Sequence, residues 1–490
     1  VTTITTEQFR GQATVKDGKT LVGMLNLNCG QSGSEWAQGT DYPVFAADSE
    51  RQGKKLMIAP LFPDCEFTVS VEGEGVSYSA ERGVYTITND AGLVKLTRSD
   101  GKKDLWVSAD ASGTNGARVS DEGYTLTAQR TTLYYGTEAD LSADITWWYN
   151  YQTQTRYAIY SVAALRGIAR LVNSGMVADG FEGDLLELKG ADFTFKEDHE
   201  PIGTEKYPFK GSFAGSSVSR ISGLTVSEDH INAGLFGVVD GGTIQYVTIA
   251  DTTKTVENAE KTVSAGIIAG SGNVGSIVGW LKSGTVKDCM STAVVNGSDN
   301  AAAVGGLVGL NEGTVSSSYY YNDERIGTPI VGKTVGENAD VKQCFYLAGD
   351  GESTFGEGSD TGAREKLEFE AGRVTYELNG PNGYLWLLDT VAKRPTLKNA
   401  YPRTMNISQL TLTAEELPEG AMAEIRLGDE NTIVLTNGNT QYVYGTDSVW
   451  IPMTVESVTQ GYQVIFDPSP SKGKLRIGSK YTYKLTAADI

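Results

Sequence analysis

Histidine, the usual proton carrier of hydrolases, occurs twice in the 490 residues, as His199 in KEDHEPIGT and His230 in SEDHINAGLFG. A Ser-His-Asp site needs a histidine beside a nucleophile. Both histidines follow acidic residues and directly precede expected strands, a pattern that predicts solvated turns. No spacing joins them into a metal site. The histidines therefore favour neither a hydrolase nor a metal centre.

Paired acids are the second chemistry to consider, because glycan lyases and hydrolases place two carboxylates, or an acid and a base, in one groove. The candidates in the glycine-rich middle of the chain are Asp240, Asp288, Asp299, Glu312 and Lys282. Asp240 and Glu312 fall in polar turns between glycines, where acids are expected simply because turns face water. The acids alone do not predict an enzyme.

An acidic stretch, AGDGESTFGEGSDTG at 348–362, sets Asp350, Glu352, Glu357 and Asp360 among glycines. Hard oxygen ligands on a flexible loop suit calcium. The stretch lacks the fixed alternation of an EF-hand or of a calcium-binding nonapeptide repeat. Calcium is the one cofactor for which the sequence offers a place, and a plain acidic loop is the alternative interpretation.

Aromatic residues offer a binding surface. Trp280 together with Tyr319, Tyr320 and Tyr321 could stack on a sugar or insert into a protein partner. Successive side chains of a strand point to opposite faces, so at least one of the three tyrosines is expected in the core. The sequence thus predicts an exposed aromatic surface on the repeats described next.

A recurring segment surrounds these residues. AGLFGVVDGGTIQYVTIAD begins at Ala233, GSIVGWLKSGTVKDCMSTAVV at Gly275, and GGLVGLNEGTVSSSYYYND at Gly305. Units too short to bury their own apolar face must stack on neighbours. They predict a right-handed parallel β-helix over 155–401, with glycines at tight corners that need positive φ.

Cysteines test this repeat model. Cys289 in TVKDC and Cys344 in DVKQC occupy one position in two repeats, with Ser318 in the repeat between them. Two strand spacings separate them by roughly 10 Å, which exceeds the reach of a disulfide. The repeat model predicts a thiol at each position, while pairing between Cys29 and Cys65 stays open.

The ends of the predicted β-helix carry their own signals. YSVAALRGIARLVNSG has apolar residues at helical spacing, Ser161 as N-cap and Gly175 as the stop, which predicts one helix that covers the open end of the stack. At the other end, Trp386 and Leu388 are expected to plug the last repeat.

Composition extends the β assignment to the flanks. The chain has 58 glycines, 13 prolines and a formal net charge of −20. Alternating strand patterns in 1–154 and 402–490 predict one or two N-terminal β-sandwich units and a C-terminal β-sandwich. Net negative charge opposes phosphate backbones, so nucleic acid is excluded as a partner.

The segments AGLFGVVDGGTI, GSIVGWLKSGTV and GGLVGLNEGTV, with the flanking AALRGIARLVNSG, EPIGT, VTYELNG and RPTL, resemble the GLUG motif of Bacteroidales surface proteins regarded as adhesins. The final GSKYTYKLTAADI is similar to the last strand of fimbrillin-like sandwiches. The resemblance implies export to the cell surface and adhesion to a host or bacterial protein or glycan, with fimbrial subunits as further partners, and it brings no catalytic residues. A glycan-active β-helix enzyme or a noncatalytic polysaccharide-binding module is the alternative.

Overall fold

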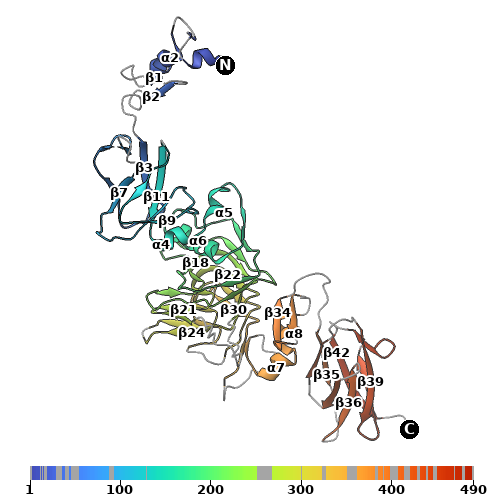
Figure 1. Ribbon diagram of the computed structural model, residues 1–490. Helices are drawn as coiled ribbons and strands as arrows, with labels where there is room; N and C mark the ends of the chain where they lie inside the picture. The colour runs from blue at the N-terminus through green and yellow to red at the C-terminus, as the bar shows by residue number, and fades with distance from the viewer. Residues whose placement is uncertain are drawn as a thin grey trace, which may run out of the picture. The chain divides into compact units, whose positions relative to one another are not determined.

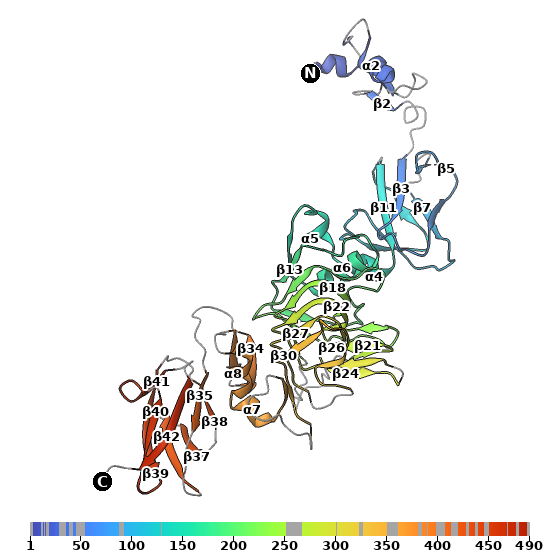
Figure 2. The ribbon, with the colours of Figure 1, turned by 180° about the vertical axis from the view of Figure 1, so that it is seen from behind.

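The computed structural model describes the chain in two compact units, Val1–Tyr149 and Asn150–Ile490 (Figures 1 and 2). The description leaves out 1–2, 11–12, 14, 16–18, 29–35, 39–42, 46–53, 88–92, 129, 251–266, 300, 323–326, 350–360, 381–384, 390, 398–406, 413–419, 428–430, 437–439, 445–449, 468, 477–479 and 488–490. Strands dominate both units, so the protein is mainly β, as the composition predicts.

Unit 1 contains two larger sheets, apart from a separate two-stranded one. The three-stranded sheet has the order β10-β7-β4 and the six-stranded sheet the order β5-β6-β3-β11-β8-β9. Leu56 and Leu133 of the larger sheet pack with Val71 and Val94 of the smaller one. The strands are β3 (Lys54–Pro60), β4 (Val69–Glu72), β5 (Val76–Ser79), β6 (Val84–Ile87), β7 (Leu93–Arg98), β8 (Leu105–Ser108), β9 (Ala117–Val119), β10 (Tyr124–Thr125) and β11 (Arg130–Gly136).

Short elements complete unit 1. Thr137 caps α4 through a side-chain oxygen that accepts a hydrogen bond from the Asp140 backbone N–H, as N-cap threonines do. The other short elements are α1 (Thr6–Phe9), α2 (Leu21–Asn28), β1 (Trp36–Gln38), β2 (Pro43–Phe45), α4 (Glu138–Ser142) and α5 (Thr146–Tyr149).

Unit 2 begins with a stack of parallel strands. Of its three central repeats, the first two visit four sheets in the same order and the third visits the first three of them. The first uses β17 (Asn232–Ala233), β18 (Phe236–Gln245), β19 (Thr248–Ile249) and β20 (Ile267–Gly270); the second β21 (Asn273–Gly275), β22 (Val278–Lys287), β23 (Met290–Ser291) and β24 (Val294–Gly297); the third β25 (Ala303–Gly305), β26 (Val308–Asn311), β27 (Thr314–Ser316) and β28 (Tyr319–Tyr320). Equivalent strands pair in parallel from one repeat to the next. The repetition read from the sequence is therefore a repetition in space.

Further strands extend two of these sheets. The nine-stranded sheet runs β12-β13-β15-β18-β22-β26-β29, with β27 and β30 beside this path, and the seven-stranded sheet runs β14-β16-β19-β23-β28-β31-β32. The added strands are β12 (Arg156–Ile159), β13 (Leu185–Leu188), β14 (Asp192–Thr194), β15 (Ser212–Ala214), β16 (Arg220–Ser222), β29 (Val331–Thr334), β30 (Asp340–Lys342), β31 (Phe345–Leu347) and β32 (Gly362–Arg364).

The registers also place the cysteines. Val286 pairs with Val315, which pairs with Val341, so Cys289 and Cys344 lie two strands apart with Ser318 between them. Both side chains are buried thiols, as predicted.

The predicted helix is confirmed as α6 (Val162–Asn173). The Ser161 hydroxyl accepts a hydrogen bond from the Ala164 backbone N–H at 3.1 Å. Leu165, Ile168 and Val172 are completely buried. Figures 1 and 2 show α6 at the end of the stack where β12 and β13 lie, opposite the later repeats.

The expected plug at the far end needs correction. Trp386 and Leu388 belong to an antiparallel hairpin, β33 (Trp386–Asp389) and β34 (Arg394–Leu397), preceded by α7 (Lys366–Glu370) and α8 (Arg373–Asn379). This segment, 366–397, is called the covering segment below. Trp386 packs in one cluster with Met290, Tyr319 and Phe345. These three are register partners along one sheet, so the covering segment lies along a sheet face across several repeats.

A buried ion pair fastens the covering segment. Arg364 at the end of β32 is fully buried, and its Nε donates to Glu377 Oε2 of α8 at 2.9 Å. Glu377 Oε1 also accepts from Arg373 Nε at 2.8 Å. Breaking such a pair leaves an uncompensated buried charge. The covering segment is thus tied to the last described strand of the stack.

Two four-stranded sheets end the chain, in the orders β38-β35-β42-β40 and β37-β36-β39-β41. Ile425 and Leu435 of one sheet share a core with Tyr483 and Leu485 of the other. The strands are β35 (Ile407–Leu412), β36 (Met422–Leu427), β37 (Asn431–Thr436), β38 (Thr440–Tyr444), β39 (Trp450–Val458), β40 (Tyr462–Asp467), β41 (Lys474–Arg476) and β42 (Lys480–Ala487).

The expectation that glycine supplies positive φ holds at Gly242 and Gly284, the glycines before threonine in two repeats, with φ of 62° and 93°, and fails at other corners. Between the two long sheets, four successive corners carry a left-handed residue that is not glycine: Tyr246, Asp288, Ser317 and Gln343, with φ between 48° and 58°. Gly309 of the repeat motif is needed for space, because a Cβ there would lie 2.5 Å from Val274 N. Close approach of backbones, and not positive φ, explains this glycine.

Candidate ligand-binding site

Trp280 of β22 is the one predicted aromatic that combines partial exposure with a polar frame. Its register partners are Val238 and Leu310 in the neighbouring repeats. The indole Nε1–H donates to Glu312 Oε1 at 3.1 Å. Lys282 Nζ lies 5.3 Å from the ring centroid, within the range of a cation–π contact. Residues of two repeats therefore fix the orientation of the ring.

Asp240 extends this frame from the preceding repeat. Its Oδ2 lies 3.5 Å from Lys282 Nζ, and its Oδ1 accepts a hydrogen bond from the Ser283 hydroxyl at 2.9 Å. The side chains of Asp240 and Lys282 are about one third exposed (34% and 32%). We call Asp240, Trp280, Lys282, Ser283 and Glu312 the Trp280 surface.

The Trp280 surface has the chemistry of recognition. A general base must be free to reach the proton that it abstracts. The carboxylates of Asp240 and Glu312 are instead engaged with neighbouring side chains: both accept a hydrogen bond, and Asp240 also faces the Lys282 ammonium group. A partly exposed ring with polar groups at its edge suits a ligand with apolar faces and hydroxyls.

The repeats contained a signal for this surface. Asp240, Lys282 and Glu312 each stand three residues after the second glycine of their repeat, at Gly237, Gly279 and Gly309. Stacking in parallel therefore brings an acid, a base and an acid close together, although a register shift makes Ser283 the partner of Asp240. In the sequence these residues are catalytic candidates only, and no motif links them to Trp280.

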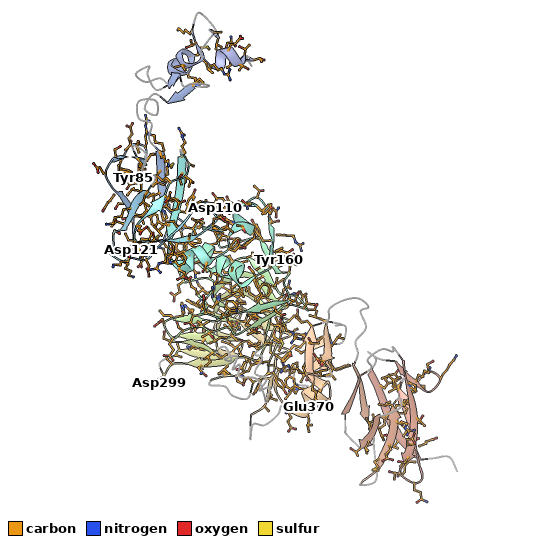
Figure 3. All side chains as sticks on the ribbon, viewed as in Figure 1. Tyr85, Asp110, Asp121, Tyr160, Asp299 and Glu370 are labelled. Atoms are coloured by element: carbon orange, nitrogen blue, oxygen red, sulfur yellow. The ribbon has the colours of Figure 1, made fainter. Side chains whose placement is uncertain are left out.

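Two other acidic candidates lie elsewhere. Asp288 occupies one of the left-handed corners, and desolvation by burial raises the pKa of its carboxyl to about 6. Asp299 is exposed and points away from the stack at its edge (Figure 3). Neither residue contributes to the Trp280 surface.

The tyrosines correct the expected aromatic surface. Tyr319 and Tyr320 are both 0% exposed. The Tyr320 hydroxyl donates to the Ala293 carbonyl at 2.8 Å, while the Tyr319 ring stacks edge-on with Trp386 at 5.6 Å. Desolvation raises the pKa of the Tyr319 hydroxyl. Both faces of β28 are covered, so these rings stabilise the fold and are not presented to a ligand.

Tyr321 is half-buried and also separate from Trp280. Its ring contacts Phe369 at a centroid distance of 4.9 Å, and the Arg394 guanidinium carbon lies 5.2 Å from its centroid. Trp280 belongs to the nine-stranded sheet, whereas Tyr321 follows β28 of the seven-stranded one. The four predicted aromatics therefore do not form one surface.

His199 also departs from the expected solvated turn, since it is 1% exposed. Its Nε2 lies 3.0 Å from the Leu235 carbonyl oxygen, and its ring packs against Phe195 at 5.0 Å. His230 is half-buried in a turn. Sequence reasoning missed the burial because the acidic neighbours of His199 point outward while its own side chain points inward.

The predicted calcium ligands Asp350, Glu352, Glu357 and Asp360 lie outside the described residues. Within the part of the chain that the structure describes, no group of three His, Cys, Asp or Glu side chains is placed to hold a metal ion.

Comparison of the chain with protein-family models, with curated proteins and with solved structures finds no match.

Proposed function

We propose that 155–401 form a right-handed parallel β-helix between β-sandwich regions, and that the protein is an exported cell-surface adhesin that binds a glycan without turnover. The repeated order of parallel sheets in successive repeats supports the β-helix, and crossovers between parallel strands are right-handed in nearly all proteins. The paired sheets in 54–136 and 407–487 support the sandwiches. The resemblance to GLUG-motif surface proteins supports the cellular role.

The Trp280 surface carries the functional part of the proposal. The indole is oriented by Glu312, and Asp240, Lys282 and Ser283 supply donors and acceptors beside it. Sugars offer apolar ring faces for stacking and hydroxyls for such groups, which favours a glycan over a protein as the ligand. None of the helices described is long and apolar enough to cross a bilayer.

The test is a screen of the purified chain on a glycan array, with immobilised mucin and matrix proteins beside it, with and without calcium. The same glycans are assayed for product release. We expect binding without product, and the Trp280→Ala variant should weaken it at least about tenfold, or about 1.4 kcal/mol. Trp280→Phe should keep part of the affinity because a ring face remains.

Trp147→Ala is the matched control. Trp147 is a partly buried indole in unit 1, and its Nε1–H is likewise bonded, at 2.8 Å from the Asp144 carbonyl oxygen. Binding unchanged by Trp280→Ala, or lowered equally by the control, would remove the Trp280 surface from the proposal.

A glycan-active enzyme is the second candidate, favoured only by the presence of two carboxylates, Asp240 and Glu312, at one surface. Product release would establish it in place of the adhesin. The Asp240→Asn and Glu312→Gln variants would then identify which carboxylate the reaction needs.

A further inference from the structure

A row of side chains on the seven-stranded sheet is covered over only part of its length. The row runs through Asp192, Arg220, Thr248, Met290 and Tyr319 in successive strands. The covering segment buries Met290 and Tyr319, whereas Asp192 and Arg220 are exposed. The edge of the covering segment therefore crosses the row between Thr248 and Met290.

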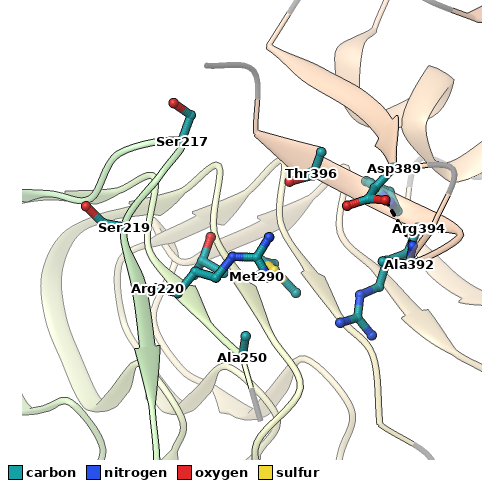
Figure 4. A pocket seen from close by; sticks show the side chains of 11 residues that line it. Ser217, Ser219, Arg220, Ala250, Met290, Asp389, Ala392, Arg394 and Thr396 are labelled. Atoms are coloured by element: carbon teal, nitrogen blue, oxygen red, sulfur yellow. Dashed lines mark hydrogen bonds between the residues drawn. The ribbon is translucent and has the colours of Figure 1, made fainter. Parts of the chain in front are cut away.

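A small pocket of about 30 Å³, called the Arg220 pocket below, lies at this edge. Figure 4 shows Arg220 entering it from the stack and Arg394 from the hairpin β33–β34 on the other side. The remaining lining consists mainly of hydroxyl-bearing and small residues: Ser217, Ser219, Thr248, Ala250, Met290, Asp389, Ala392, Pro395 and Thr396. The pocket admits a small polar group and not a whole sugar ring.

The two arginines differ from the others in unit 2. Every other arginine of this unit whose side chain the structure describes has a carboxylate oxygen within 4.0 Å: Arg156, Arg166, Arg170, Arg364, Arg373 and Arg426. Among the described residues, Arg220 and Arg394 have no such ion pair. In a chain with a formal net charge of −20, two arginines at one pocket that form no close ion pair are free to bind an anion.

Asp389 is the one acid in the lining. Its Oδ1 accepts hydrogen bonds from the backbone N–H groups of Val391 and Ala392, both at 2.9 Å; Figure 4 marks the bond to Ala392. The carboxylate thus holds the turn that carries Arg394. Two guanidinium groups against one carboxylate leave the pocket with net positive charge.

We propose that this pocket binds one oxyanion, a carboxylate or a sulfate, carried by an acidic sugar. Guanidinium groups match such oxyanions with pairs of parallel N–H donors, and the stacking of Arg394 on Tyr321 orients one of them. The sugar ring stays outside, over the exposed part of the row. The anion site stands on the pocket itself, and the sugar as carrier rests on the proposed glycan-binding function.

The probes are methyl β-glucuronide, glucose 6-sulfate and the uncharged methyl β-glucoside. Binding is followed by isothermal titration and by the NMR signal of the Met290 methyl group in the full chain, assigned with Met290→Leu. We expect one or both charged probes to shift the Met290 signal and the uncharged one to leave it unchanged. The two charged arms distinguish a carboxylate site from a sulfate site.

Arg220→Gln and Arg394→Gln should each weaken the charged probe at least about tenfold. Arg220 is exposed, so its variant should fold even if loss of the Arg394 contact with Tyr321 unsettles the hairpin. The Arg220→Lys and Arg394→Lys variants keep the positive charge but lack the paired N–H donors of a guanidinium group. They should therefore keep only part of the affinity. Arg156→Gln removes the same charge from the Glu187 pair on β12 and should leave binding unchanged.

Three results would overturn the proposal: no shift of Met290 with either anion, an equal shift with the uncharged sugar, or an equal loss in Arg156→Gln. Trp280→Ala should retain binding of the charged monosaccharide. If the charged monosaccharides bind but the glycan array gives no signal, the adhesin proposal is contradicted and the anion-site proposal is supported.

Discussion

At the scale of single residues, His199 is a buried base whose environment opposes its charge. Desolvation, then the positive charge of Arg166 and His230, lowers its pKa from 6.5 to about 4, against the hydrogen bond to Leu235. Above pH 6.5 the side chain is neutral in both folded and unfolded chains. Below it, the unfolded chain binds the proton first, so the free energy of unfolding falls.

We therefore expect His199 to cost stability as the pH falls from about 6.5 to about 4, by at most about 3 kcal/mol. Urea unfolding of the wild type and of His199→Gln across this pH range measures the loss in the free energy of unfolding. The Gln amide can still donate to Leu235 and does not titrate. Asp288, whose pKa is raised to about 6, contributes with opposite sign in both proteins, so the difference between them isolates His199. Parallel pH profiles would contradict a depressed His199 pKa.

At the scale of elements, the spacing of the repeats depends on glycines that let backbones approach. A Cβ at Gly309 in β26 would lie 2.5 Å from Val274 N of β21 and 2.6 Å from the Gly279 carbonyl oxygen. Backbone atoms of paired strands cannot move aside without disturbing the next repeat. A methyl group there should therefore strain the stack itself.

Gly309→Ala should lower the free energy of unfolding by about 2–4 kcal/mol. Gly183→Ala is the control, because Gly183 has a φ of 85° but no atom within 4 Å of an added Cβ, so it should cost only about 1–2 kcal/mol of backbone strain. Denaturant unfolding of both variants compares the two costs. A Gly309→Ala loss no larger than that of Gly183→Ala would show that the strands are not closely packed at this position.

The elements also show how far sequence reasoning reached. Helix α6 and the stacked repeats follow from local periodicity, which one segment of chain carries by itself. The burial of Tyr319 does not, because a residue on the outer face of a sheet is buried only if a distant segment covers it. That segment includes α8 and Trp386, and nothing in the alternation of 314–321 indicates where it docks. The Trp280 surface and the Arg220 pocket likewise join residues from different repeats.

At the scale of the whole molecule, the formal net charge of −20 opposes the local charge of the Arg220 pocket. The electrostatic effect of the net charge extends further from the protein than that of the two arginines. Screening shortens the Debye length from about 30 Å at 0.01 M salt to about 8 Å at 0.15 M. The repulsion between the chain and an approaching polyanion is long-ranged and is lost first, while contacts inside the pocket persist.

An acidic oligosaccharide should consequently associate faster as salt rises from about 0.01 M to about 0.15 M. Proteins that attract polyanions with a basic surface show the reverse. Stopped-flow or surface-based kinetics with a sulfated or uronate oligosaccharide measure this, with an uncharged oligosaccharide of equal length as the control whose rate should not change. Dissociation from the wild type should accelerate modestly over the same range, because salt weakens the direct contact between the oxyanion and the arginines. The acceleration should be smaller in Arg220→Gln, which has lost one of these contacts. An association rate that falls steadily with salt would mean that local positive charge, and not the net charge of the chain, governs the encounter.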